Sequence, residues 1–310
     1  MKPIETFLLA ADELTLLDLA GPAEVFRLAN RHAQREVFAQ HFCGVTPEVR
    51  TSGGLHLSRL EALPASLPDA ALVLVLGLST AATQKLSAMH PIAAWLRQHF
   101  DPARHCLATV CAGAVIAAHA GVLRGLRCTT HHDVFELLKL AEPSAIPLQN
   151  RLFVEDGAVL TCAGVTAGID LSLMLVERYT SPQIALATAQ DLVVFMRRSG
   201  ADPQLSPLLE FRNHVHAAVH RAQNAVLAEP AAHWSAGMLA NIAHVTPRHL
   251  TRLFQTEAGI TPLEYVRHIR AALALQLSAD SAHSKERVAE LAGFSSAQQM
   301  RRALNKLLLK

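Results

Sequence analysis

The last hundred residues of this chain carry one sequence pattern twice. Residues 239–254 (LANIAHVTPRHLTRLF) and 288–304 (VAELAGFSSAQQMRRAL) each predict a short helix, a tight turn and a second helix with exposed Arg side chains. A protein that lies along DNA uses such a pair, because one recognition helix in the major groove contacts only a few base pairs. The repeat therefore predicts an all-α C-terminal domain with two helix-turn-helix units, and double-stranded DNA as its partner.

The second helix of the first unit is predicted to have an apolar face and a polar face. Thr246 is expected to cap this helix and Pro247 to open it. Leu250, Leu253 and Phe254 recur at helical spacing and predict the core face. On the polar face Arg suits guanine and Gln suits adenine in the major groove. The candidate DNA contacts of this unit are Arg248, His249, Arg252 and Gln255.

The second unit aligns with the first after one extra residue in its turn, so that Met300 takes the place of Leu250. Its candidate DNA contacts are Gln298, Gln299, Arg301 and Arg302. Residues 260–280 between the units predict a long helix, with Ile269, Leu273 and Leu277 facing inward. The length of this helix is expected to set the distance between the two recognition helices.

The charge distribution agrees with this interpretation. The chain has a formal net charge of only +2, but residues 210–310 hold 12 Lys and Arg against 7 Asp and Glu, a net of +5. The remaining residues hold 16 against 19, a net of −3. A basic C-terminal domain on an acidic body indicates a polyanion partner for that domain alone.

The first two hundred residues alternate short apolar runs with helical patterns. IETFLLA (4–10) and ALVLVLG (71–77) are typical of strands that helices cover on both faces. Asp156–Gly157 lies between two alternating runs and predicts a β-hairpin over 151–164. The alternation predicts an α/β fold with a parallel sheet. The helices are expected at 19–33, 81–100, 113–123 and 164–179.

This organisation ends in RRSGADPQLSPLL (197–209), where one Gly, two Pro and two Ser predict a linker. Expected are therefore an α/β sensor domain over 1–197, a linker over 198–209 and a DNA-binding domain over 210–310. The total of 310 residues with 51% hydrophobic content suffices for two cores of ordinary size.

Cysteine usage and hydropathy indicate a cytoplasmic protein. The five cysteines are irregularly spaced, with no pair at zinc-finger spacing, so neither a disulfide framework nor a metal site is expected, and no cofactor. Acidic residues interrupt the N-terminal apolar stretch that a signal peptide would need. The apolar run 71–78 is too short to cross a membrane.

The main chemical candidate is Cys111 in LATVCAGAVIAAHAG. A strand that runs through a Cys and small residues directly into a helix predicts a nucleophile elbow, whose backbone N–H groups would lower the pKa of the thiol. Asp18 follows the first strand and is expected at the same sheet edge. An ionised Asp beside the thiol would oppose formation of the thiolate unless it were protonated or hydrogen-bonded. His131, followed by His132, lies at a predicted helix start with Thr130 and Asp133 as caps. Sequence leaves open whether an imidazole reaches the thiol; a buried structural Cys and a polar helix start are the alternatives.

Motifs in both parts of the chain resemble those of known families. LDLAGPAEVF, ATVCAGAVIAAHAGVLRGLRCTTHH and VEDGAVLTCAGVTAGIDLSLMLVE resemble the PfpI/ThiJ type of class I glutamine amidotransferase-like domain, which implies a flavodoxin-like sheet. TPRHLTRLFQTEAGITPLEYVRHIR resembles the AraC helix-turn-helix domain. Together the motifs are similar to the GlxA-like transcriptional regulators, over nearly the whole chain.

The chain also departs from these relatives. Ala112 follows the Cys, where isonitrile-hydrating relatives place a hydroxyl residue and peptidase-like relatives a His. His132 stands where the regulators commonly have Trp. The resemblance implies a ligand site around Asp18, Cys111, Ala112 and His131, and among its effectors amines and amino-acid derivatives. The scarcity of Trp and Tyr argues against a quaternary ammonium ligand, which needs an aromatic box.

The C-terminal end differs as well. AraC proteins continue through an Arg-rich turn, a Gly and a Pro into a closing helix, whereas this chain ends in RRALNKLLLK. The second unit is therefore expected to be truncated, with Leu304, Leu307 and Leu308 exposed, or covered by a partner subunit or by altered packing. Exposure would cost about 1.5–3 kcal/mol for each side chain that loses its burial.

These observations favour a cytoplasmic, homodimeric transcriptional regulator that is not an enzyme and whose α/β domain binds a small effector. The alternative is a Cys-dependent hydratase or amidase of the PfpI type with an accessory helical domain. A third hypothesis is a redox-sensing regulator, in which Cys111 is reactive and its oxidation is the signal.

Overall fold

The computed structural model describes residues 2–194, 197–202, 204, 211–212, 214–278 and 284–308, except the side chains of 276 and 306–308. The chain divides into two compact units, Met1–Gln204 and Leu205–Lys310.

A seven-stranded sheet forms the centre of the first unit, with strand order β10-β11-β7-β6-β1-β2-β5. Every neighbouring pair is parallel except β10 and β11, which pair antiparallel as a hairpin. The strands of this sheet are β1 (Ile4–Ala10), β2 (Phe38–Gly44), β5 (Glu61–Ala62), β6 (Leu72–Val75), β7 (Cys106–Val110), β10 (Phe153–Asp156) and β11 (Val159–Cys162). The α/β prediction is thus confirmed, and β1 has the predicted bounds.

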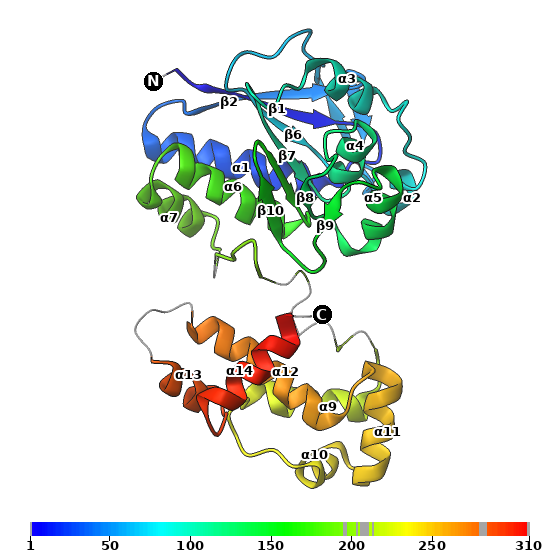
Figure 1. The fold of residues 1–310 in the computed structure, drawn as a ribbon, viewed down its shortest axis with the longest axis vertical. Coiled ribbons are helices and arrows are strands. Elements are labelled where there is room, and N and C mark those ends of the chain that lie inside the picture. Colours follow the sequence, from blue (N-terminus) through cyan, green and yellow to red (C-terminus); the bar gives the residue numbers. More distant parts are fainter. Residues whose placement is uncertain are drawn as a thin grey trace. The chain divides into compact units, whose positions relative to one another are not determined.

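Helices cover both faces of this sheet (Figure 1). On one face α1, α6 and α7 pack against one another, and α3, α4 and α5 form a second group. The helical segments of the unit are α1 (Leu16–Ala33), α2 (Thr80–Thr83), α3 (Pro91–His99), α4 (Gly113–His119), η1 (His132–Val134), α5 (Phe135–Ala141), α6 (Thr166–Tyr179) and α7 (Pro182–Asp191). Two small sheets pair β3 (Glu48–Arg50) with β4 (His56–Ser58) and β8 (Arg127–Cys128) with β9 (Ile146–Pro147).

The prediction of a single helix over 81–100 is wrong, because this segment forms two separate helices, α2 and α3. His90 has an extended backbone, with φ −57° and ψ 132°, and Pro91 opens α3. The ring of a proline disfavours the helical conformation of the residue before it, so the chain cannot continue one helix through His90.

The second unit is helical. Its helices are α9 (Ala217–Ala228), α10 (Ala236–Ala243), α11 (Pro247–Ala258), α12 (Pro262–Ser278), α13 (Lys285–Leu291) and α14 (Ala297–Leu308). The pairs α10–α11 and α13–α14 are the two predicted helix-turn-helix units, and α12 is the predicted long helix between them. No helix in the described ranges combines the length and hydropathy needed to cross a membrane.

Each helix-turn-helix unit has its own hydrophobic core. Leu250 and Phe254 are fully buried with Tyr265 and Ile269 in the first core. Met300 is buried with Val288 and Phe294 in the second core, against which Leu273, Leu277 and Leu304 pack half-buried. Leu304 is therefore half-buried by packing within its own chain, which agrees with the alternative of altered packing. Leu307 and Leu308 lie outside the described side chains.

Phe254→Ala should destabilise the second unit selectively. Removing a fully buried ring that packs on Tyr265 leaves a cavity, with an expected loss of about 3–5 kcal/mol in the free energy of unfolding. Urea unfolding of the full chain, followed by circular dichroism, measures this loss. Gln255→Ala, at an exposed position of the same helix, is the matched control and should change the transition little. Equal effects of the two substitutions would contradict this packing.

Candidate functional site

Cys111 occupies a strained turn between β7 and α4. Its φ is +55°, a left-handed conformation that is uncommon for any residue other than glycine. The Cys111 N–H donates to the Cys162 carbonyl of the neighbouring strand at 3.1 Å, and its own carbonyl accepts from the Thr130 hydroxyl at 2.9 Å. These bonds hold the backbone of the predicted nucleophile elbow in place.

Two glycines make room for this turn. A Cβ on Gly164, whose φ is +88°, would lie 2.1 Å from the Cβ of Cys111. A Cβ on Gly77 would lie 2.6 Å from the same atom and 2.4 Å from Oδ2 of Asp18. Real atoms do not approach so closely, so only glycine fits at either position. The elbow, Asp18 and these two glycines therefore form one tightly packed group.

Asp18 lies in the first turn of α1 and is fully buried at 0% exposure. Its Oδ1 accepts a hydrogen bond of 2.6 Å from the backbone N–H of Val165, another strained residue with φ +50°. Its Oδ2 has no well-formed hydrogen bond among the described residues. Burial raises the pKa of Asp18 to about 6, more than the contacts from Val165, Cys111 and Gly77 lower it. The prediction that Asp18 lies at the elbow is confirmed.

The expected lowering of the Cys111 pKa is wrong. Burial raises the pKa of the thiol, the carboxylate of Asp18 raises it further, and the N–H of Ala112 opposes them only in part. Desolvation disfavours the thiolate more strongly than one backbone dipole favours it. Cys111 is buried at 7% exposure, and its thiol is protonated at neutral pH.

His131 lies beside this group without bonding to the thiol. Its Nδ1 accepts from the N–H of Asp133 at 3.3 Å, which makes the imidazole, and not Thr130, the cap of η1. In the described part of the chain His131 makes no hydrogen bond to Cys111. Burial lowers the pKa of His131, and the neighbouring His132 lowers it further. Ala112 is fully buried and contributes its backbone N–H rather than a side-chain contact.

The segment that leaves the first unit is tied to both sides of the elbow, which sequence reasoning did not detect. Arg198 pairs with the buried Asp170 at 2.6 Å and donates to the hydroxyl of Thr166, the first residue of α6. Gln204 donates from Nε2 to the Thr130 carbonyl at 2.8 Å. The beginning of the expected linker is thus hydrogen-bonded to the residues that flank Val165 and hold Cys111.

On α11 the candidate DNA contacts face solvent. Thr246 caps the helix by accepting from the N–H of His249 at 3.3 Å, and Pro247 opens it. Arg248, Arg252 and Gln255 are exposed, whereas His249 is half-buried and pairs through Nδ1 with Arg252 at 3.2 Å.

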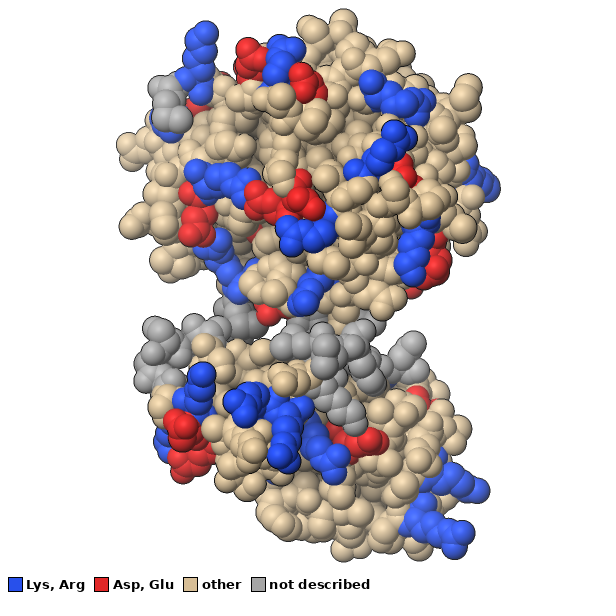
Figure 2. Space-filling view, viewed as in Figure 1, with Lys and Arg blue, Asp and Glu red and all other residues tan. Residues whose placement is uncertain are grey.

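On α14 the candidates Gln298, Arg301 and Arg302 are exposed. Gln299 is exposed too, but its Oε1 accepts from the N–H and the hydroxyl of Ser295 at 3.0 Å each. This side chain serves as a helix cap, which leaves mainly its amide nitrogen for another partner. Figure 2 shows Lys and Arg side chains gathered on the visible face of the second unit.

Comparison with known proteins decides the family. The DJ-1/PfpI family matches residues 6–178, more than half of the chain. The chain belongs to the DJ-1/PfpI family. Residues 239–308 match a helix-turn-helix domain of a second family. The resemblance that the sequence motifs carry is therefore confirmed.

Individual relatives agree with this assignment. The HTH-type transcriptional regulator GbdR of Pseudomonas aeruginosa is 28% identical, over 93% of this chain and 77% of its own length. GlxA of Rhizobium meliloti, another such regulator, is 28% identical over 64% of this chain and 61% of its own. An isonitrile hydratase of Pseudomonas putida is 34% identical, but over only 35% of this chain and 44% of its own. A crystal structure of a ThiJ/PfpI family protein from Pseudomonas syringae superposes with a TM-score of 0.54 at 22% identity, covering 67% of this chain and 79% of that one.

Asp18→Asn should change how stability depends on pH. A carboxyl group whose pKa rises from 3.8 to about 6 on folding stabilises the protein fully below pH 4 and loses that contribution as the pH rises through 6. Between pH 4 and 7 the wild type should therefore lose roughly 3 kcal/mol relative to the variant, from two pKa units at about 1.4 kcal/mol each. Urea unfolding across this range measures the difference. Parallel stability curves for the two proteins would contradict a raised pKa at Asp18.

Proposed function

We propose that this protein is a sequence-specific DNA-binding transcriptional regulator whose DJ-1/PfpI unit binds a small effector. The observation that carries the proposal is the pair of helix-turn-helix units, each with its own core and each with exposed Arg and Gln side chains on its second helix. The regulator GbdR, whose similarity spans 93% of this chain and therefore both of its parts, supports it. We further propose that it acts in the cytoplasm as a homodimer.

The two recognition helices have different roles in this proposal. On α11 the side chains of Arg248, Arg252 and Gln255 would contact base edges and phosphates, with His249 orienting Arg252. On α14 the corresponding contacts would come from Gln298, Arg301 and Arg302, and from Gln299 only through its amide nitrogen. We therefore expect α11 to contribute more base-specific hydrogen bonds than α14.

The effector is proposed to bind at the group of Asp18, Cys111, Ala112 and His131, of which His131 is half-buried and the other three are buried. The buried Oδ2 of Asp18 retains acceptor capacity, and its carboxyl carries a negative charge above pH 6. A ligand that donates N–H groups would satisfy this oxygen, which favours an amine or an amino-acid derivative. Such a ligand changes DNA binding only if it binds two arrangements of the protein unequally.

Residues 198–204 offer a route from this site to the DNA-binding unit. Gln204 donates a hydrogen bond to the carbonyl of Thr130, and the hydroxyl of Thr130 donates to the carbonyl of Cys111. Arg198 donates to the hydroxyl of Thr166, at the start of α6 and next to Val165. The next residue along the chain, Leu205, begins the second unit. A ligand that moves either side of the elbow would therefore pull on the segment that connects the two units.

A Cys-dependent hydratase or amidase is the second candidate, and the strained φ of Cys111 favours it. The raised pKa of the thiol, the absence of a hydrogen bond from His131 to the thiol in the described residues, and Ala112 in place of a hydroxyl all oppose it. The raised pKa likewise opposes signalling by oxidation, which needs thiolate character. Turnover that disappears in Cys111→Ala would support the enzyme, and a change of DNA binding with peroxide would support the redox sensor.

Arg252→Ala should weaken binding to a promoter fragment upstream of the protein's own or neighbouring genes. Loss of one base contact costs about 1–3 kcal/mol, which corresponds to a roughly 5- to 150-fold weaker affinity. Gel retardation of the full chain over a series of salt concentrations measures this change, and phosphate contacts should make the wild-type affinity steeply salt-dependent. Arg35→Ala, at an exposed position of the first unit, is the control. Equal affinity of the two variants, or no retardation at low salt, would refute the proposed interface.

Gln204→Ala should uncouple the effector from DNA. The variant keeps every side chain of the proposed effector site and of α11 and α14, so both affinities should stay near those of the wild type. The change in DNA affinity on adding an effector, found by thermal-shift screening of amines and amino-acid derivatives, should shrink. Fluorescence anisotropy of labelled promoter DNA with and without that compound measures the coupling. Full coupling in the variant would exclude this route.

A further inference from the structure

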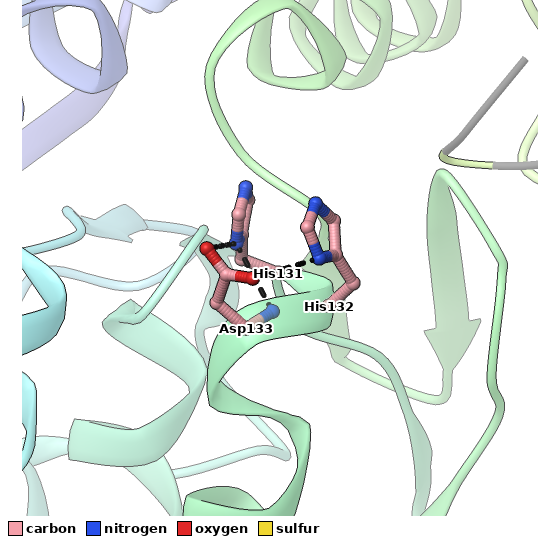
Figure 3. A group of neighbouring side chains, drawn as sticks. All are labelled: His131, His132 and Asp133. Atoms are coloured by element: carbon pink, nitrogen blue, oxygen red, sulfur yellow. Dashed lines mark hydrogen bonds and ion pairs between the residues drawn. The ribbon is translucent and has the colours of Figure 1, made fainter. Parts of the chain in front are cut away.

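Three neighbouring side chains at the start of η1 point toward one another: His131, His132 and Asp133 (Figure 3). Nδ1 of His132 lies 2.9 Å from Oδ1 of Asp133, and Nδ1 of His131 lies 3.7 Å from Oδ2 of the same carboxylate. One donor atom from each residue falls within 4.8 Å of the other two. Two imidazoles and a carboxylate are the ligand types that proteins offer to zinc and similar transition metals.

The donor atoms lie near enough together for a metal site to form. Metal–ligand bonds of about 2.0–2.2 Å in tetrahedral geometry separate two ligand atoms by about 3.3–3.6 Å. Here one donor atom from each residue lies within 4.8 Å of the other two, and the two imidazoles face different oxygens of one carboxylate, Oδ1 at 2.9 Å from His132 and Oδ2 at 3.7 Å from His131. Only rotation of exposed or half-buried side chains is needed to close the set around one ion, because all three residues lie on one short turn.

The backbone of this turn is held in advance. Thr130, directly before His131, donates its hydroxyl to the Cys111 carbonyl and accepts at its own carbonyl from Gln204. The rings of His131 and His132 stack with centroids 4.3 Å apart, which aligns the two imidazoles. The 3.3 Å bond from the Asp133 N–H to His131 is long, so replacing it with a metal ion costs little.

Other histidines beside carboxylates lack this arrangement. His56 has only one acidic neighbour, Glu48, at 2.7 Å. His41 contacts Glu5 through Nε2 and Glu61 through Nδ1, and nitrogens on opposite sides of one ring cannot chelate the same ion. Among the described residues, only the group at 131–133 brings three such donors together.

We propose that His131, His132 and Asp133 bind one divalent transition-metal ion such as Zn²⁺, with the remaining coordination position open to solvent or to a further ligand. The sequence did not predict this site, because it has no cysteine pattern typical of zinc sites. The proposal does not depend on DNA binding.

Titration of the full, tag-free chain with ZnCl₂ tests this site, after treatment with a chelator and by isothermal titration calorimetry. The tightest class of sites should hold one Zn²⁺ per chain. His132→Phe keeps a ring stacked on His131 but removes both nitrogens, and Asp133→Asn removes the carboxylate charge. Each substitution should weaken this class by about ten-fold or more.

His56→Ala is the matched control, because it removes an exposed histidine with a single acidic neighbour. It should leave the tightest class unchanged. Circular dichroism of each variant shows that it is folded, and Zn²⁺ should raise the melting temperature of the wild type and of His56→Ala only. Undiminished affinity in His132→Phe and Asp133→Asn, an equal loss in His56→Ala, or no saturable Zn²⁺ binding by the wild type would overturn the proposal.

Discussion

The hydrogen bond from the Val165 backbone to the buried carboxylate of Asp18 holds the centre of the first unit together. It joins the first turn of α1 to the start of α6, and it fixes a β-branched residue at φ +50° opposite a cysteine at φ +55°. Backbone strain of this kind costs of order 1–3 kcal/mol at each residue and persists only where the surroundings enforce it. Close packing around Gly77 and Gly164 supplies that enforcement. The elbow therefore has a single arrangement that a bound molecule can disturb.

This arrangement suits a sensor better than a catalyst. A nucleophilic thiol needs a lowered pKa and a base within hydrogen-bond reach, whereas burial and Asp18 raise the pKa of Cys111. In the proposed sensor, the same packing would transmit a small shift of this strained, close-packed group to its neighbours. Arg198 and Gln204 are among those neighbours, and they lie on the segment that leads to the DNA-binding unit.

Elements with strong local signals could be predicted from sequence. The apolar run of β1 and the Thr246–Pro247 start of α11 lie where the patterns place them. Asp18 and Cys111 could be brought together in advance, because the carboxyl ends of neighbouring parallel strands share one edge of the sheet. The repeated helix-turn-helix pattern likewise predicted which side chains are buried, since Leu250 and Met300 occupy equivalent places in two separate cores.

What sequence could not supply depends on contacts between distant residues. The direction of the Cys111 pKa follows from how deeply the fold buries the thiol, which the local motif does not encode. Gln204 donates to the carbonyl of Thr130, 74 residues away in sequence, and no periodicity in the sequence predicts such a hydrogen bond. The sequence pattern leaves the side chain of Gln299 available to contact DNA. In the structure, however, its Oε1 accepts a hydrogen bond from Ser295, four residues earlier. Helix α3 begins afresh because Pro91 ends the preceding helical pattern.

In the function proposed above, this DJ-1/PfpI chain binds DNA through its second unit. Genome-wide mapping of its binding sites in living cells, by cross-linking and sequencing, shows whether this claim holds. Discrete sites that share a sequence motif should appear upstream of a small set of genes, and they should vanish when Arg248 and Arg252 are both replaced by Ala. Occupancy without any enriched site, or an identical map for the double variant, would contradict the claim.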